Sequence, residues 1–229
     1  VVVGYYKNES VIEKIKAFAS VAKTIDFSKG MRVAMFGNNM RDVAVTDGDR
    51  VESEIHFGWN VNYYGIGDLV DIINEITDAE IEVKLNEYNS LYTMDTDNID
   101  SVKEQAKYEV ALEKFLKKNN ISAFTDTFED LHGLRQLPGL AVQNIMKNGV
   151  GFGPEGDYKT SALGAVLSKM AEGRNGATGF TEDYTYDLTD GEELELASHM
   201  LEVSPVFAET KPKIQVHPLS IGGKEAPAR

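Results

Sequence analysis

Three side chains in the second half of the sequence are of the types that bind a divalent metal ion or transfer protons: Glu155, Glu182 and His199. Carboxylates and imidazole suit hard-to-borderline divalent ions such as Mn²⁺ and Mg²⁺. Two carboxylates can also act as a general acid and a general base. The chain has no cysteine, which excludes thiolate ligands and disulfides. Spacing alone leaves open whether the three side chains meet.

The first of these glutamates lies in a glycine-rich stretch, GVGFGPEGDYKT. Gly151, Gly153 and Gly156 fit the G-x-G-x-x-G pattern of dinucleotide-binding loops, which follows a strand and opens a helix. Here a predicted helix precedes the glycines, and Glu155 and Asp157 would repel a pyrophosphate. We therefore predict a loop that presents a functional carboxylate, with a solvated acidic turn as the alternative.

The second glutamate lies in the alternating segment FTEDYTYDL. If this segment is a strand, Glu182 shares a face with Phe180, Tyr184 and Tyr186, and we expect that face to be buried. A buried carboxylate must be neutralised, hydrogen-bonded or bound to a metal ion. A hydrogen bond to a nearby tyrosine hydroxyl is the structural alternative.

The histidine lies on the next predicted strand. A two-residue hairpin loop at Asp190–Gly191 would place Glu182 directly opposite His199, on the same face. A register slipped by one residue would match the aromatic face better to Leu194 and Leu196 and would turn the histidine away. We expect the first register because a shared metal site requires it.

The elements that must position these residues alternate between strands and helices as far as about residue 175. Apolar runs such as MRVAMFG and ISAFTDT predict short buried strands. Between them lie periodic helical segments, among them one capped by Ser10 with an apolar face and one that runs from Pro138 to Gly149. The opening VVVGYY indicates the end of a strand. This order predicts an α/β fold, a parallel sheet flanked by helices (Rossmann-like), followed by the start of an antiparallel β domain.

We divide the chain accordingly into three parts. Residues 1–25 are interpreted as the tail of a preceding α/β domain, and residues 26–176 as a central α/β domain. Residues 177–229 are interpreted as the first strands of a C-terminal, β-barrel-like domain. The start at Val1 rather than at a methionine indicates a piece of a larger protein.

Charge and hydropathy limit the partners. The 229 residues carry a formal net charge of −14, which disfavours a polyanionic partner such as nucleic acid. The sequence shows neither a signal peptide nor an apolar run long enough to span a membrane. We therefore predict a cytoplasmic protein that acts on a small molecule, with no membrane partner.

Several long motifs resemble the L-arabinose isomerase family, and they occur in the family's order along essentially the whole chain. They are FGNNMRDVAVTDGDRVESEIHFGW, DTFEDLHGLRQLPGLAVQ, FGPEGDYKT, EDYTY, SHMLEV and HPLSIGGKEAPAR. The resemblance implies an Mn²⁺-dependent aldose–ketose isomerase that converts L-arabinose to L-ribulose and also D-galactose to D-tagatose. It further implies a homo-oligomer, hexameric or tetrameric in full-length members, which are about twice this length.

The resemblance also implies roles for particular residues. Glu155 and Glu182 correspond to the family's acid/base pair and to two of its metal ligands, and His199 to a third ligand. Phe128 and Ile221 correspond to residues next to the substrate. The family's fourth ligand, another histidine, lies beyond the segment that this chain resembles.

Two other functions fit the residues. The chain could be a non-catalytic α/β module that supplies an oligomer interface and half of a site. It could also be a glycosidase that uses two carboxylates without a metal ion. Metal dependence distinguishes the isomerase from the glycosidase, and turnover by the isolated chain distinguishes it from the module.

Overall fold

A parallel four-stranded sheet forms the centre of the molecule. The computed structural model describes residues 1–173 and 178–229. The sheet has the order β2-β1-β4-β5, and every neighbouring pair is parallel. Its strands are β1 (Arg32–Phe36), β2 (Asn60–Tyr64), β4 (Ala123–Asp126) and β5 (Gly151–Phe152). The predicted α/β fold with a parallel sheet flanked by helices is confirmed.

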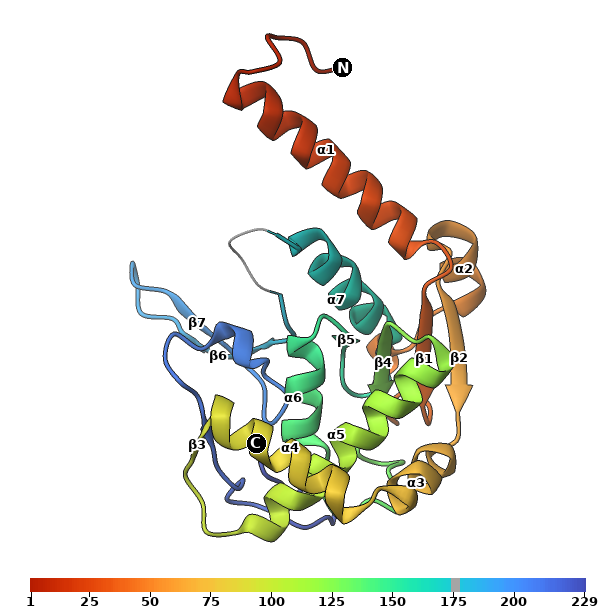
Figure 1. Cartoon of the computed structure of the whole chain (residues 1–229), viewed down its shortest axis with the longest axis vertical. Helices are drawn as coiled ribbons and strands as arrows, with labels where there is room; N and C mark the ends of the chain where they lie inside the picture. The colour runs from red at the N-terminus through yellow and green to blue at the C-terminus, as the bar shows by residue number, and fades with distance from the viewer. Residues whose placement is uncertain (174–177) are drawn as a thin grey trace.

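Helices connect these strands and cover both faces of the sheet (Figure 1). They are α1 (Glu9–Ser28), α2 (Arg50–Phe57), α3 (Ile66–Glu75), α4 (Asp78–Leu91), α5 (Ile99–Asn119), α6 (Gly139–Lys147) and α7 (Tyr158–Ala171), with short 3₁₀ turns at Ala44–Thr46 and Pro205–Phe207. None of the helices in the described residues is long and apolar enough to cross a membrane.

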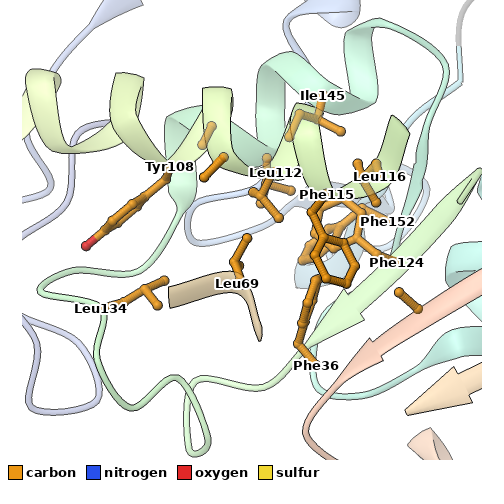
Figure 2. Packing of buried hydrophobic residues seen from close by; sticks show 14 of the residues in the cluster. Phe36, Leu69, Tyr108, Leu112, Phe115, Leu116, Phe124, Leu134, Ile145 and Phe152 are labelled. Carbon is orange, nitrogen blue, oxygen red and sulfur yellow. The ribbon is translucent and has the colours of Figure 1, made fainter. Parts of the chain in front are cut away.

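Alternation along the strands separates the core into two layers. Ala34 and Phe36 of β1 point to one face, and Val33 and Met35 point to the other. On the first face, α3, α5 and α6 bury an aromatic cluster in which the rings of Phe36 and Phe115 lie 4.9 Å apart (Figure 2). On the second face, α7 supplies Tyr158, Ala162 and Ala165. Because both faces are covered, β1 is apolar and buried from Val33 to Phe36, as central parallel strands usually are. In contrast, β2 contains Asn60 and Asn62, and β4 ends in Thr125 and Asp126.

The N-terminal segment differs from the sequence prediction. Val1 to Tyr6 form no strand, and α1 begins after Asn8, so Ser10 lies inside the helix and is not its cap. The predicted apolar face is largely exposed: the exposed fraction of Phe18 is 74%, and Val11 is the one hydrophobic residue of α1 that is buried. Helix α1 extends away from the sheet and contacts α7 near its C-terminal end (Figure 1).

The antiparallel element predicted after the sheet is also present. Strands β6 (Glu182–Asp187) and β7 (Leu194–Ser198) form a two-stranded antiparallel sheet. The boundary predicted between residues 176 and 177 lies outside the described residues. Further along, β8 (Lys213–Ile214) pairs in parallel with β3 (Thr93–Met94), and Ala228 accepts a hydrogen bond from Leu140 of α6. The end of the chain therefore packs against the α/β layers.

Candidate active site

Glu155 is held in a fixed and strained loop between β5 and α7. Its φ is +64°, in the left-handed region that residues other than glycine rarely adopt. Its carbonyl accepts a hydrogen bond from Met40 N (2.8 Å), and the next amide, Gly156 N, donates to the carbonyl of Asp126 (3.0 Å). Strain of this kind is retained where the surroundings impose it, often at functional sites. The loop thus sets the carboxylate beside the carboxyl end of β4.

The three glycines around this glutamate allow close packing. A Cβ on Gly151 would clash with the Ser161 carbonyl of α7, and one on Gly156 would clash with the backbone of Asn38 and Asn39. Asp157 caps α7 by accepting hydrogen bonds from the amides of residues 159 and 160, both at 3.0 Å. Since a side chain already satisfies the helix N-terminus, a phosphate-binding interpretation of the loop is disfavoured.

Glu182 begins β6, and His199 follows the last residue of β7. Near the turn the register is the predicted one, with Thr185 opposite Leu196 and Asp187 opposite Leu194. An irregularity between Asp183 and Thr185 then shifts the pairing by one residue, so Glu182 lies opposite Ser198. The prediction that Glu182 directly faces His199 is therefore wrong. A single-residue bulge leaves no clear mark on an alternating sequence.

The two side chains nevertheless approach each other. His199 Nε2 lies 3.8 Å from Glu182 Oε2. On the other side of the ring, His199 Nδ1 lies 2.7 Å from Glu202 Oε2, an ion-pair contact whose angle is not that of a hydrogen bond. The ring of Phe180 packs edge-on against the imidazole at 5.1 Å. These contacts point Nε2 of the imidazole towards Glu182.

The aromatic face expected to be buried around Glu182 is instead exposed. Tyr184 and Tyr186 are about half exposed, at 49% and 53%, and the Glu182 side chain is 40% exposed. The physical reason is that β6 pairs with β7 alone in a two-stranded sheet that protrudes from the described structure (Figure 1). The Tyr186 hydroxyl hydrogen-bonds Asp183 and not Glu182.

Electrostatic interactions and burial shift the pKa values of three groups in the site. Burial raises the pKa of Glu155, and the negative charge of Glu182 raises it further. Burial acts to lower the pKa of His199, but contact with Glu202 and the charges of Glu182 and Glu155 outweigh it, so the pKa is raised. Burial, followed by the charge of Glu202, raises the pKa of Asp126 to about 8. The site is a cluster of carboxyl groups around one imidazole.

One pocket of about 210 Å³ contains four of the five predicted site residues, Phe128, Glu155, His199 and Ile221. Glu182 does not line it but contacts His199 from outside. The remaining walls consist of two acidic and six largely apolar residues: Asp126, Glu202, Leu131, Leu137, Pro138, Pro154, Met200 and Leu201. Few polar groups among apolar walls are typical of a small-molecule site.

Two residues of this pocket were not predicted as site residues. Asp126 ends the strand motif ISAFTD, and its place at the carboxyl end of a parallel strand was an available signal. Glu202 follows His199 by three residues in SHMLEV, a spacing that indicates no contact outside a helix. The role of Asp126 depends on how distant segments meet, and that of Glu202 on its local contact with His199.

The donor set fits a divalent ion such as Mn²⁺ in its chemistry: two carboxylates and one imidazole, with no thiolate. The raised pKa of Glu155 is partly caused by Glu182, so the two carboxylates repel each other, and a cation between them would relieve that repulsion. Within residues 1–173 and 178–229, however, no three acidic or histidine side chains converge closely enough to form a ready-made metal-binding group.

Fold and site together define an α/β protein with an acidic pocket at the carboxyl edge of a parallel sheet, where proteins of this class usually bind small molecules. Two family models match the chain: the L-arabinose isomerase central domain over residues 32–173 and the L-arabinose isomerase C-terminal domain over residues 177–229. The chain belongs to the L-arabinose isomerase family.

Individual relatives agree over the whole chain. It is 50% identical to an L-arabinose isomerase of Geobacillus stearothermophilus and 51% identical to one of Anoxybacillus flavithermus, and both alignments cover 100% of this chain and 47% of the relative. It is 52% identical to L-arabinose isomerase 2 of Bacillus licheniformis, of which it covers 49%. The chain thus spans about half the length of these relatives.

Proposed function

We propose that this chain carries part of the active site of an aldose–ketose isomerase that converts L-arabinose to L-ribulose and, as a second substrate, D-galactose to D-tagatose. The observation that carries the proposal is the single pocket that brings together Phe128, Glu155, His199 and Ile221, with Glu182 in contact with the histidine. About 50% identity to named L-arabinose isomerases supports the choice of substrate.

The reaction removes a proton from C2 of the aldose and returns it at C1. Glu155 lines the pocket, so its carboxylate can reach the carbon atoms of a sugar bound there. We assign the carbon proton to Glu155. Glu182 lies outside the pocket wall and, in this proposal, serves the hydroxyl proton and the metal ion.

Glu155, Glu182 and His199 would hold one Mn²⁺. Such an ion supplies Lewis-acid stabilisation of negative charge on the sugar oxygens. Glu202 orients the ring of His199 through Nδ1 and leaves Nε2 as the donor atom. Phe128 and Ile221 form apolar walls that exclude water from the reacting carbons.

A non-catalytic module that supplies half of a site is the second candidate, and it is favoured because no three acidic or histidine side chains of the described residues form a ready-made metal-binding group. We further propose a cytoplasmic homo-oligomer in which the remaining ligand and pocket wall come from other parts of the full-length protein.

The two candidates are distinguished by a chimera in which this chain replaces the matching 47% of the Geobacillus stearothermophilus relative. We expect a folded chimera to form L-ribulose from L-arabinose with Mn²⁺, and the 229-residue chain alone to form none. Glu155→Gln in the chimera should abolish turnover. A chimera that melts cooperatively but forms no ketose would contradict the isomerase proposal, as would ordinary turnover, about 1–10³ per second, that survives Glu155→Gln.

A further inference from the structure

Asp126 occupies the position where an open parallel sheet binds ligands. It is the last residue of β4, which lies between β1 and β5. From β1 the chain first runs to β2 on one side and later to β4 on the other, so the strand order reverses between β1 and β4. Crevices at the carboxyl ends of strands beside such a reversal are the usual ligand sites of open α/β sheets.

The surroundings of this carboxyl group differ from those of Glu109, another buried carboxylate of the α/β layers. Asp126 is only 8% exposed, yet none of the residues that the structure describes makes a hydrogen bond to its carboxyl oxygens. Its carbonyl, by contrast, accepts a hydrogen bond from Gly156. Glu109, which is 1% exposed, has its carboxylate hydrogen-bonded to Lys84, Tyr88 and Asn144.

The carboxyl oxygens of Asp126 are not among the fully buried side-chain atoms that lack a partner, so they open onto the pocket. A ligand in the pocket would supply the hydrogen bond that this largely buried group lacks. Asp126 lines the same pocket as Phe128 and Glu155, so a molecule that reaches Glu155 also reaches this carboxyl group. A carboxyl group pairs well with hydroxyls, because its oxygens accept from an O–H and its protonated form also donates to one.

We propose that Asp126 is a substrate-binding residue that hydrogen-bonds a hydroxyl group of the sugar at the end of β4. The inference rests on the proposed function for the identity of the sugar. It assigns to Asp126 the role of selecting polyhydroxylated ligands. A site built to hydrogen-bond a substrate hydroxyl discriminates strongly against a ligand that lacks it, because the buried partner is then left unpaired.

The test uses the 229-residue chain and L-arabinose as the probe, with binding followed by backbone amide chemical shifts. We expect wild type to bind and Asp126→Ala to weaken binding about tenfold, the loss of one hydrogen bond. Asp126→Asn keeps an acceptor and a donor and should stay within about threefold of wild type. Asp100→Asn, an exposed residue outside the pocket, is the matched control and should bind as wild type does.

A second readout separates binding from a structural role. Because no partner holds the carboxyl group, Asp126→Asn should melt at or above the wild-type temperature at pH 7. If the carboxylate of Asp126 had a structural role, the substitution would instead lower the melting temperature of the chain. Equal binding by wild type and Asp126→Ala overturns the inference and leaves the chimera result standing. If the wild-type chain binds no L-arabinose, the inference about Asp126 fails. The isomerase proposal is decided separately, by the activity of the chimera.

Discussion

At the scale of single residues, the contact between His199 and Glu202 gives the site its most specific geometry. Nδ1 lies 2.7 Å from the Glu202 carboxylate, and this contact is a main reason why the pKa of His199 is raised. Metal-binding histidines usually have such a partner on the ring nitrogen that does not bind the metal ion. If His199 binds the metal ion as proposed, Glu202 is a positioning residue.

Replacing this partner gives the first prediction. Glu202→Gln should lower the pKa of His199, measured by the NMR titration of its ring protons, and should weaken Mn²⁺ binding about 10- to 100-fold. The exposed Glu209→Gln is the control and should change neither quantity. An unchanged His199 titration in Glu202→Gln would show that the two side chains do not interact in solution.

Asp126 makes stability depend on pH in a defined direction. The folded chain holds its proton up to a pKa of about 8, while the unfolded chain releases it near the ordinary value of 3.8. The folded state therefore binds more protons between these values, and this group destabilises the fold increasingly as pH rises through that window.

The corresponding prediction compares wild type with Asp126→Asn, which cannot ionise. The melting temperature of the variant minus that of wild type should grow from about pH 4 to about pH 8 and then level off. Thermal melts at several pH values measure this difference. A difference that stays constant across the range would show that the carboxyl group titrates normally in the folded chain.

Residue types and motifs made Glu155, Glu182 and His199 recognisable as candidates, because their chemistry and their resemblance to a family are local in the sequence. Asp126 and Glu202 could not be found in this way. The importance of Asp126 comes from a pocket whose walls lie far apart in the chain, and that of Glu202 from one ring contact. The roles of the first three residues remain predictions until a ligand is observed.

At the scale of elements, the loop from β5 to α7 depends on one glycine. Gly156 has φ +80°, and a Cβ there would clash with Asn39 Cα and the Asn38 carbonyl. Gly30 has nearly the same φ, +78°, but no atom lies within 4 Å of its would-be Cβ. Comparing substitutions at these two glycines therefore separates the cost of the left-handed backbone conformation from the cost of the steric clash.

We expect Gly30→Ala to cost about 1 kcal/mol, the penalty of a left-handed alanine. Gly156→Ala should cost clearly more, because the neighbouring backbone must move, and it should also displace Glu155. Chemical denaturation measures both free energies of unfolding. Equal losses in the two variants would mean that the close approach of this loop to Asn38 and Asn39 is incorrect.

A buried ion pair holds α4 against α5. Lys84 is 2.9 Å from Glu109, a side chain only 1% exposed, and Tyr88 and Asn144 complete the hydrogen bonds of that carboxylate. The same two helices carry a more exposed pair, Lys114 and Glu80, at 2.6 Å. The two pairs differ in burial and in the two further carboxylates, Glu87 and Glu113, that Lys84 contacts.

Removing the lysine should reveal that difference. Lys84→Met leaves Glu109 charged and buried without its cation, so the free energy of unfolding should fall by about 3 kcal/mol or more. Lys114→Met should hardly change the melting temperature, because solvent screens the exposed pair. Matching small effects in both variants would show that the Glu109 network is not buried in solution.

The hairpin of β6 and β7 contains one feature that the alternating sequence pattern does not predict. The turn is as predicted, with Glu192 N donating to the Thr189 carbonyl, and so is the register next to it. The irregularity near Tyr184 then shifts the rest by one residue. Alternation in a sequence cannot reveal a bulge, because one extra residue changes the pairing without changing the residue types.

At the scale of the whole molecule, the order of strands and helices made the α/β class predictable, since buried parallel strands are apolar throughout and alternate with amphipathic helices. Exposure was not predictable in the same way. The sequence pattern predicts that the apolar face of α1 and the aromatic face of β6 are buried. In the structure, Phe18 is 74% exposed and Tyr186 is 53% exposed. Periodicity in the sequence shows that one face of an element is apolar, but it does not show which other element, if any, covers that face.

The central claim is that Glu155, Glu182 and His199 hold one divalent metal ion in a sugar-binding pocket. The most direct test is a crystal of this chain grown with Mn²⁺, with anomalous scattering used to locate the ion. We predict one peak bonded to a carboxylate oxygen of each glutamate and to His199 Nε2, at about 2.0–2.6 Å. A well-ordered site without such a peak, or a peak held by other residues, would contradict the account.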